Sequence, residues 1–419
     1  MTTRPGDAST DRSAALLRAR NAVAVVFALN GLLFASLVSR IPDLRGRLGL
    51  DNGQLGLLLL TIAVGSLVAL PLTGRLVARF GARAVVRSGA AAATAGLLVA
   101  GVSTGAGLVV PCAVGLAAYG GGVGLWDVAM NVEAAEVERA LDRPVMPRFH
   151  AGFSFGSVLG AGLGAGVVAL DLPLLGHLAV VALAATAVVL RVTRDFRPDH
   201  AADAGSGGSG GSAGAPGEVA PPVVDGRSAW TEPRTLALGL MVLAFAVAEG
   251  TANDWLSLAL IDGYDAPRWL GVAGFSLFVV AMTAGRLVGP VVLTRWGRPG
   301  TLWCSCGLAA LGILVVVHGG TPVFVAAGIV VWGLGASLGF PVGMSAAADD
   351  PVRAAARVSV VSTVGYGAFL AGPPLLGRLG DVVGTLPSLQ VVALLMAPAA
   401  IAVLATRVPA TSPEGADGC

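Results

Sequence analysis

Long apolar stretches separated by short polar ones run through nearly the whole chain. A helix that crosses a bilayer needs about 20 mostly apolar residues, and the pattern predicts twelve such spans. They lie at residues 21–39, 55–73, 84–103, 107–131, 151–170, 176–191, 236–258, 270–292, 301–318, 322–345, 358–377 and 388–406. The segment between the sixth and seventh spans is rich in glycine, serine and proline, which is typical of a flexible coil.

The order of these stretches predicts two halves of six helices each. We expect an N-terminal tail at 1–20, one half at 21–191, a linker at 192–235, the second half at 236–406 and a C-terminal tail at 407–419. The word Gly-Arg-Leu-Val occurs at 74–77 and again at 285–288. After each copy an arginine stands two residues before a glycine, as Arg79 and Gly81 and as Arg295 and Gly297. Duplicated halves are typical of transporters that open to either side of a membrane.

Composition identifies lipid as the solvent of this chain. Hydrophobic residues make up 55% of the 419 residues, charged residues make up 12%, and the mean hydropathy is +0.79. An average soluble domain has about 25% charged residues. The net charge of +2 is too small to indicate a nucleic-acid partner, and the four cysteines predict neither a disulfide framework nor a metal site. We therefore expect no cofactor and no metal.

Arginine is distributed unevenly between the predicted loops, and this bias predicts the orientation. With the N-terminus inside, 22 of the 27 arginines lie in cytoplasmic segments and 5 in outer ones. Basic residues collect on the cytoplasmic side of membrane proteins, so we expect both termini to be cytoplasmic. The first apolar stretch is interpreted as an uncleaved span, and the expected location is the cytoplasmic membrane of a bacterium.

Three stretches and one loop resemble a known family. The loop after the second span has the pattern Gly-x-x-x-x-Arg-x-Gly, and the stretches are Arg40-Ile-Pro-Asp-Leu44, Asp127-Val-Ala-Met-Asn-Val-Glu133, and Glu249 with Asp254-Trp255. Together with the six-plus-six division they resemble the major facilitator superfamily, in its branch of MosC-like and YbjJ-like membrane proteins, distantly similar to fucose permease. The resemblance implies an all-α fold of two pseudo-symmetric halves around a central cavity lined by spans one, four, seven and ten.

The loop departs from the family pattern at one position, and this departure affects the expected gate. The family carries an aspartate where this chain has Ala78, and Thr294 stands at the corresponding place in the second half. We expect the arginines to take over, with Arg79 paired to Glu133 or Glu136 and Arg295 paired to Asp349 or Asp350. The candidate gate residues are Gly74, Arg75, Arg79, Gly81, Arg83, Arg286, Arg295, Glu136 and Asp350. The alternative is that these arginines only set the topology.

Polar residues inside the seventh span are the main candidates for a solute site. A carboxylate at the bilayer centre costs at least about 2.5 kcal/mol, so it needs a wet cavity, a partner or a proton. Phe245, Glu249 and Asn253 fall on one helix face at intervals of four. An aromatic ring beside a carboxylate and an amide suits a hydroxylated solute, and Glu249 is the first candidate for proton coupling. Asp254 is expected near the outer interface.

Spans one, four and five add weaker candidates. Asp127 and Asn131 lie four residues apart in span four beside Trp126, and span one offers Asn30 and Phe34 on one face. His150 at the start of span five is either a proton relay or a residue bonded to a loop carbonyl.

These features predict a monomeric secondary transporter of a small polar organic solute, sugar-like or cyclitol-like, coupled to protons. The alternatives are a drug or metabolite efflux antiporter, which the absence of a Gly-Pro motif in span five disfavours, and a membrane protein that senses a solute without transporting it. An enzyme is not expected, because the sequence shows no pair of nucleophile and base.

Overall fold

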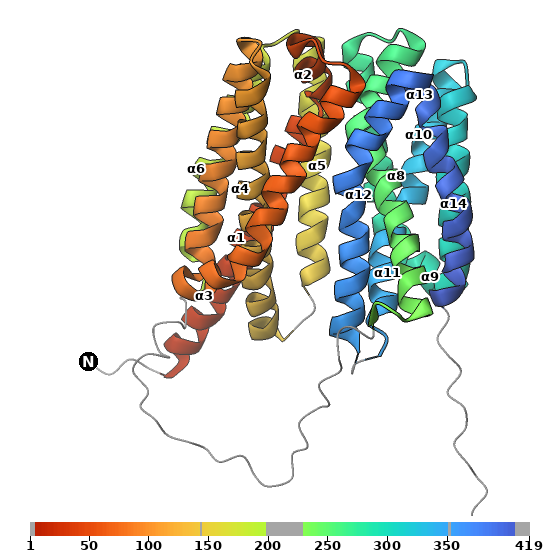
Figure 1. Cartoon of the computed structure of the whole chain (residues 1–419). Coiled ribbons are helices and arrows are strands. Elements are labelled where there is room, and N and C mark those ends of the chain that lie inside the picture. The colour runs from red at the N-terminus through yellow and green to blue at the C-terminus, as the bar shows by residue number, and fades with distance from the viewer. Residues whose placement is uncertain (1–4, 143–144, 198–228, 351–352, 407–419) are drawn as a thin grey trace, which may run out of the picture. The chain divides into compact units, whose positions relative to one another are not determined.

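Helices make up the regular structure of the part of the chain that the computed structural model describes, which is residues 5–142, 145–197, 229–350 and 353–406. Ten helical segments in this part are long and apolar enough to cross a membrane (Figure 1). The α-helices are α1 Pro5–Val38, α2 Ile41–Leu48, α3 Asn52–Gly105, α4 Val109–Leu141, α5 Met146–Ala169, α6 Leu174–Val192, α8 Pro233–Tyr264, α9 Arg268–His318, α10 Pro322–Ala336, α11 Gly339–Ala347, α12 Ala354–Val383, α13 Thr385–Ser388 and α14 Gln390–Ala402. Two short 3₁₀ turns, η1 Thr193–Asp195 and η3 Val403–Thr406, follow α6 and α14.

Two helices are far longer than one membrane span requires, and each contains a glycine with non-helical backbone. Helix α3 has 54 residues and turns at Gly81 (φ 79°, ψ 158°), and α9 has 51 residues and turns at Gly297 (φ 67°, ψ 174°). Glycine adopts positive φ without the steric cost that a side chain would add. These are the two glycines that the repeated pattern singled out. Each turn divides a long helix into two pieces, which supports twelve spans, although twelve separate spans stay a prediction.

Helix contacts repeat between the two parts of the sequence. A Cβ on Gly96 of α3 would meet the backbone of Tyr119 in α4, and a Cβ on Gly312 of α9 would meet the backbone of Trp332 in α10. Glycine lets membrane helices approach this closely. The same glycine-to-aromatic contact therefore occurs twice, about one half of the chain apart, which supports the duplication that the sequence predicts.

Packing divides the chain into two compact units that are described separately. The first unit contains residues 1–218, 250–283 and 369–389, and the second contains residues 219–249, 284–368 and 390–419. Helices α8, α9 and α12 contribute residues to both units. The two expected halves at 21–191 and 236–406 stay a prediction. Most of the expected linker, together with residues 1–4 and 407–419 of the tails, lies outside the described residues.

Candidate functional site

An ion pair inside the second unit joins two membrane-crossing helices. Nη2 of Arg286 in α9 lies 3.1 Å from Oε2 and 3.2 Å from Oε1 of Glu249 in α8. The side chains are 30% and 22% exposed, respectively. Arg286 was expected in the loop, but it lies eleven residues before Gly297, whereas Arg75 lies only six before Gly81. This longer spacing in the sequence indicates that Arg286 lies farther from its kink glycine, inside the helix, than Arg75 does.

The C-terminal part of α8, in the first unit, carries the candidates Asn253 and Asp254. Asn253 is buried, with 9% of its surface exposed, and Asp254 is half-buried. Within the described residues the carboxylate of Asp254 has no hydrogen bond and no ion pair. Helix α8 continues to Tyr264, six residues beyond the predicted span. Asp254 therefore lies ten residues, or about 15 Å at 1.5 Å per residue, from the end of α8, farther from that end than the predicted span gave; its place relative to the interface stays a prediction.

Three buried polar atoms flank Asp254 on α8 and have no hydrogen-bond partner in the structure. They are Thr251 Oγ1, Trp255 Nε1 and Ser257 Oγ. Buried polar groups are costly unless they are bonded, so this stretch can accept water or the hydroxyl groups of a solute. The sequence analysis did not name Thr251 or Ser257, and it named Trp255 only within the family resemblance, although the spacing of all three around Asn253 and Asp254 was visible. Phe245 is almost fully buried in the second unit, beside Gly339 of α11.

The candidates on α4 point in different directions. Trp126 is fully buried and its backbone and Cβ lie close to Gly89 of α3, whereas Asp127 is exposed. The side-chain amide of Asn131 donates to the backbone oxygen of Asp127 at 2.8 Å and reaches its Oδ1 at 3.4 Å. The Asp127 side chain is therefore partnered by Asn131 on its own helix, and Trp126 contributes to helix packing.

The candidates on α1 pack against α5. Asn30 is 3% exposed and its Nδ2 has no partner in the structure. The ring of Phe34 lies 6.4 Å from that of Phe153, and the ring of Phe27 lies 5.2 Å from that of His150. No hydrogen bond, ion pair or ring contact of the described residues joins Asn30 or Phe34 to the candidates on α4 and α8, so a shared cavity stays a prediction.

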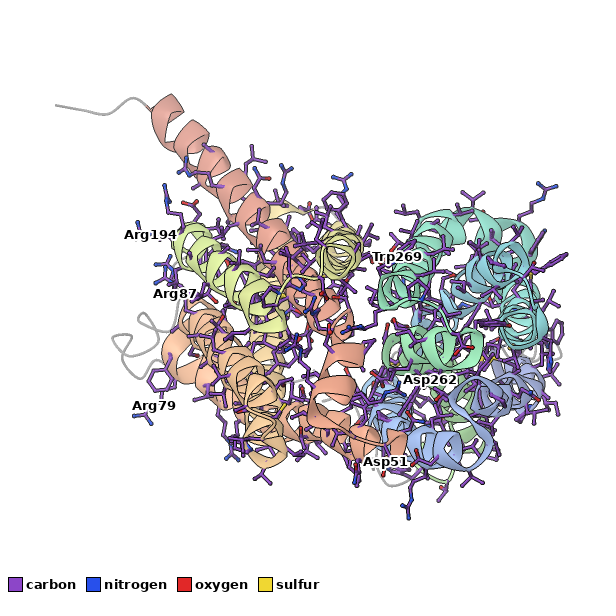
Figure 2. The ribbon with its side chains drawn as sticks, turned by 90° about the horizontal axis from the view of Figure 1, so that it is seen from above. Asp51, Arg79, Arg87, Arg194, Asp262 and Trp269 are labelled. Atoms are coloured by element: carbon purple, nitrogen blue, oxygen red, sulfur yellow. The ribbon has the colours of Figure 1, made fainter. Side chains whose placement is uncertain are left out.

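The expected gate arginine of the first half does not have the expected partners. Arg79 is exposed, points away from the helices (Figure 2), and lies over the ring of Phe80 at 5.2 Å. It makes no ion pair with any described residue. Glu133 is buried and accepts the backbone N–H of Arg197 at 2.8 Å, and the backbone oxygen of Glu136 accepts from the Arg197 guanidinium at 3.1 Å.

Two other arginines of this loop cap the end of α6. Arg83 Nη2 donates to the carbonyls of Arg194 and Phe196 at 3.0 and 2.9 Å. Arg87 Nε donates to Thr193 Oγ1 at 2.8 Å. The last carbonyls of a helix lack intrahelical partners and attract cations, so these two arginines fasten α3 to α6. Gly74 and Arg75 are exposed.

In the second unit the arginine after the kink glycine, rather than the one before it, finds a carboxylate. Asp349 pairs with Arg298 at 2.5 Å and with Arg234 at 2.9 Å. Asp350 pairs with Arg357 at 3.4 Å. Arg295 is exposed and makes no ion pair within the described part of the chain. Asp349, just after α11, thus joins α9 to the start of α8 through Arg298 and Arg234.

Glu232, just before α8, binds two arginines of the second unit. Its oxygens lie 2.6 Å from Arg353 Nη1 and 2.7 Å from Arg357 Nε, and it also accepts from Thr235 Oγ1 at 2.8 Å. The hydrogen bond from Arg357 is the main reason that the pKa of Glu232 falls from 4.5 to about 2. This cluster ties the start of α8 to the start of α12.

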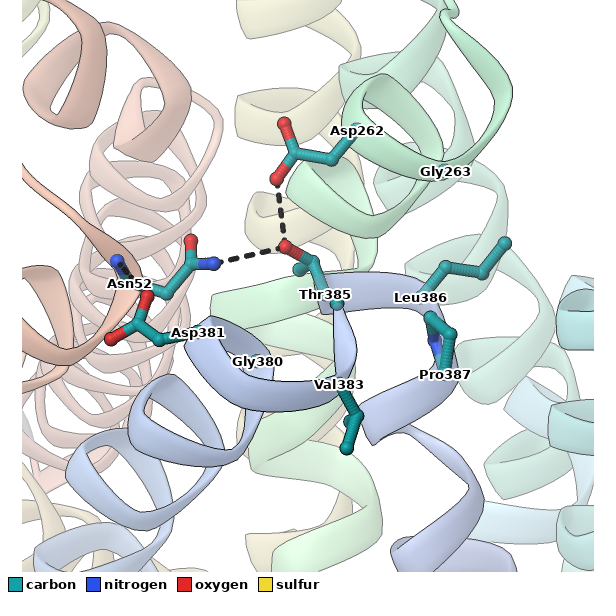
Figure 3. Close-up of a pocket in the computed structure, with 10 residues that line it drawn as sticks. Asn52, Asp262, Gly263, Gly380, Asp381, Val383, Thr385, Leu386 and Pro387 are labelled. Carbon is teal, nitrogen blue, oxygen red and sulfur yellow. Dashed lines mark hydrogen bonds between the residues drawn. The ribbon is translucent and has the colours of Figure 1, made fainter.

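A pocket of about 550 Å³ lies in the first unit where α3 begins and α8 ends (Figure 3). Arg45 of α2 forms a double ion pair with Asp262 of α8, with both N–O distances at 2.5 Å. Thr385 Oγ1 donates to Asp262 at 2.8 Å and accepts from Asn52 Nδ2 at 3.1 Å. The pocket is lined by Asn52, Asp262, Gly263, Gly380, Asp381, Val383, Gly384, Thr385, Leu386 and Pro387.

The same pocket wall caps the start of α3 with a carboxylate from α12. Asp381 accepts the backbone N–H groups of Asn52 and Gly53 at 2.9 and 2.8 Å. Asp51 accepts the next free N–H, that of Gln54, at 2.6 Å. A helix N-terminus favours negative charge, so these bonds hold α3 and α12 together. We call the polar contacts of Arg45, Asn52, Asp262, Asp381 and Thr385 the α2-end seam.

The motif Arg40-Ile-Pro-Asp-Leu44 belongs to the same end of the first unit. Asp43 pairs with Arg40 Nε at 2.9 Å and with Arg268 of α9 at 3.2 Å. Arg40 is 2% exposed and also donates to the carbonyl of Leu172 at 2.9 Å. The motif therefore fastens α1 and α2 to the start of α9, a structural role that the sequence analysis did not assign.

Comparisons with known proteins agree with this architecture. The sequence profile of the Major Facilitator Superfamily matches residues 23–373. A transporter of Sinorhizobium fredii, y4wD, is 33% identical over 87% of this chain and 92% of its own length. The membrane protein MosC of Rhizobium meliloti is 27% identical over 87% of this chain and 84% of its own length. The crystal structure of the nucleoside transporter NupG superposes with a TM-score of 0.71 at 16% identity, over 94% of this chain and 98% of that one.

Proposed function

Because this chain belongs to the Major Facilitator Superfamily, as a multi-pass membrane transporter of the MosC-like branch, we propose that it moves a small polar organic solute by proton-coupled alternating access. The observation that carries the proposal is the polar chemistry of α8, where Glu249 binds Arg286 and three buried polar atoms near Asp254 have no partner. Such groups persist in a membrane helix where cargo or ions must pass.

The solute class follows from the groups that α8 offers. The side chains of Thr251, Asn253 and Ser257 can exchange hydrogen bonds with hydroxyl groups, and the indole N–H of Trp255 can donate one. An aromatic ring also covers the apolar face of a sugar ring. These groups favour an uncharged polyhydroxylated solute, sugar-like or cyclitol-like, over a large apolar drug.

The orientation proposed here places the α2-end seam on the outer face of a bacterial cytoplasmic membrane. The excess of arginine in the loops at the opposite helix ends supports cytoplasmic termini. In this orientation the Glu232 cluster and the Asp349 pairs lie on the cytoplasmic side. The transporter works as a monomer, since one chain supplies both halves.

Flux into proteoliposomes tests the proposal. The purified chain is reconstituted, and the entry of radiolabelled glucose, xylose and myo-inositol is measured with and without an inward proton gradient. We expect at least one of these solutes to enter faster than into protein-free vesicles, and faster still with the gradient. A solute that raises the melting temperature of the protein but never crosses would indicate a sensor, and a failure of all three to bind or cross would contradict the solute class.

A further inference from the structure

The stretch of α8 from Thr251 to Ser257 points to a different coupling residue from the one that sequence spacing favours. We infer that Asp254, rather than Glu249, is the carboxylate that takes up and releases the coupling proton. The inference rests on the proton-coupled transport proposed above. It assigns to one side chain a role that the family membership leaves open.

The surroundings of Asp254 supply the first argument. Its side chain is half-buried at a depth of about 15 Å from the helix end, and it has no hydrogen bond or ion pair with the described residues. Thr251 Oγ1 and Trp255 Nε1, on the same side of the helix, are also without partners. A carboxylate at membrane depth is tolerated only with a partner, with water or with a proton. Since the described residues provide no partner, water and a proton remain.

The other membrane carboxylates supply the contrast. Glu249 already has the Arg286 guanidinium within 3.2 Å of both its oxygens. Its charge is therefore balanced without a proton, and binding one would leave Arg286 without its counter-charge. Asp127 accepts a hydrogen bond from the side-chain amide of Asn131 at 3.4 Å, so its carboxylate has a partner. Asp254 alone among these three combines depth with the lack of a partner in the described structure.

Packing around the stretch leaves Asp254 away from fixed counter-charges. Segments of α9 and α12 pack against it, with Gly271 close to the backbone of Ser257 and Gly377 close to the Trp255 ring. The charged groups of these segments and of the end of α8 do not bind Asp254. Arg268 binds Asp43, and Asp262 binds Arg45. Asp381 accepts from the start of α3, and Arg378 is exposed.

The chemical step is a reversible protonation. When the site is open to the outer solution, a proton from hydronium binds an Oδ of the Asp254 carboxylate, forms an O–H bond and leaves water behind. The neutral acid then donates that O–H to the solute or to a neighbouring hydroxyl. When the site opens to the cytoplasm, the O–H bond breaks, water accepts the proton, and the carboxylate is restored.

Infrared spectroscopy tests the protonation directly and needs no solute. Difference spectra of the reconstituted full chain between alkaline and acidic pH should show the carbonyl stretch of a protonated carboxylic acid. We expect Asp254→Asn to lose this band, Asp254→Glu to shift it, and the matched variants Glu249→Gln and Asp127→Asn to keep it. If the wild-type protein shows no such band, or if both Asp254 variants leave the band unchanged, the inference is overturned. The shift in Asp254→Glu decides the matter if Asp254→Asn does not fold.

Solute flux separates this inference from the proposed function. For whichever solute crosses, the ratio of flux with the proton gradient to flux without it should fall to unity in Asp254→Asn and stay above unity in Glu249→Gln. The opposite pattern would return the coupling role to Glu249. If no solute crosses with the wild-type chain, the proposed function fails while the infrared result still decides whether Asp254 binds a proton.

Discussion

The Glu232 cluster makes a quantitative prediction about acid stability. Glu232 has a pKa of about 2 in the folded chain against an ordinary value of 4.5. Because the folded-state pKa is depressed, its stabilising contribution is fully present above pH 4.5 and is lost as the pH falls through about 2. We expect Glu232→Gln to remove this contribution at neutral pH and to differ little from the wild-type protein near pH 2.

The size of the effect follows from the pKa difference and the exposure of the partners. Each pKa unit corresponds to about 1.36 kcal/mol, so the full difference would give about 3 kcal/mol. Glu232 and Arg357 are 18% and 13% exposed, but Arg353 is 46% exposed, and water screens exposed ion pairs. We therefore expect Glu232→Gln to lower the free energy of unfolding by about 1–2 kcal/mol at neutral pH. Arg357→Gln should lower it more than Arg353→Gln does.

Thermal unfolding in detergent between pH 2 and pH 7 measures this effect. The melting temperature of Glu232→Gln should lie below that of the wild-type chain at pH 7, and the gap should close toward pH 2. Asp142→Asn is a matched control, because Asp142 is exposed and its carboxylate makes no hydrogen bond or ion pair with described residues. A gap that stays constant across the pH range, or an equal gap for Asp142→Asn, would refute the reasoning.

Three further predictions concern the helix contacts. Glu249→Gln and Arg286→Met should each destabilise the protein, and the double variant should recover part of the loss, with a coupling of about 1–3 kcal/mol in a double-mutant cycle; additive losses would mean that the pair does not interact. Gly312→Ala should lower the free energy of unfolding by about 1–3 kcal/mol, because its methyl group would meet backbone of α10 that cannot move aside. Gly307→Ala should leave the melting temperature in detergent unchanged, because a Cβ there meets no neighbouring helix within 4 Å. Gly53→Ala places a methyl 2.8 Å from the carboxylate that caps α3, so it should open the α2-end seam and speed maleimide labelling of a cysteine placed in the pocket; unchanged labelling would contradict that role.

The sequence by itself determined the solvent, the class of fold and the family. Apolar stretches of membrane length leave only helices as a spanning structure, because every backbone group must be bonded within its own segment. The comparisons confirm membership of the superfamily and of its MosC-like branch. The two kink glycines were also visible in the sequence, since an arginine two residues before a glycine recurs and only glycine takes the observed backbone angles without strain.

Only the tertiary structure decided which charges meet. Spacing along the chain indicates which helix carries Arg79, Arg286 and Asp254. The partner of each side chain depends on how the helix is rotated, where it ends and which helix packs against it. Helix α8 continues six residues beyond its predicted end, which places Asp254 ten residues from the helix end, and five residues more before Gly297 put Arg286 beside Glu249. The α2-end seam joins positions more than 300 residues apart, such as Asn52 and Asp381, and no periodicity within one helix carries that information.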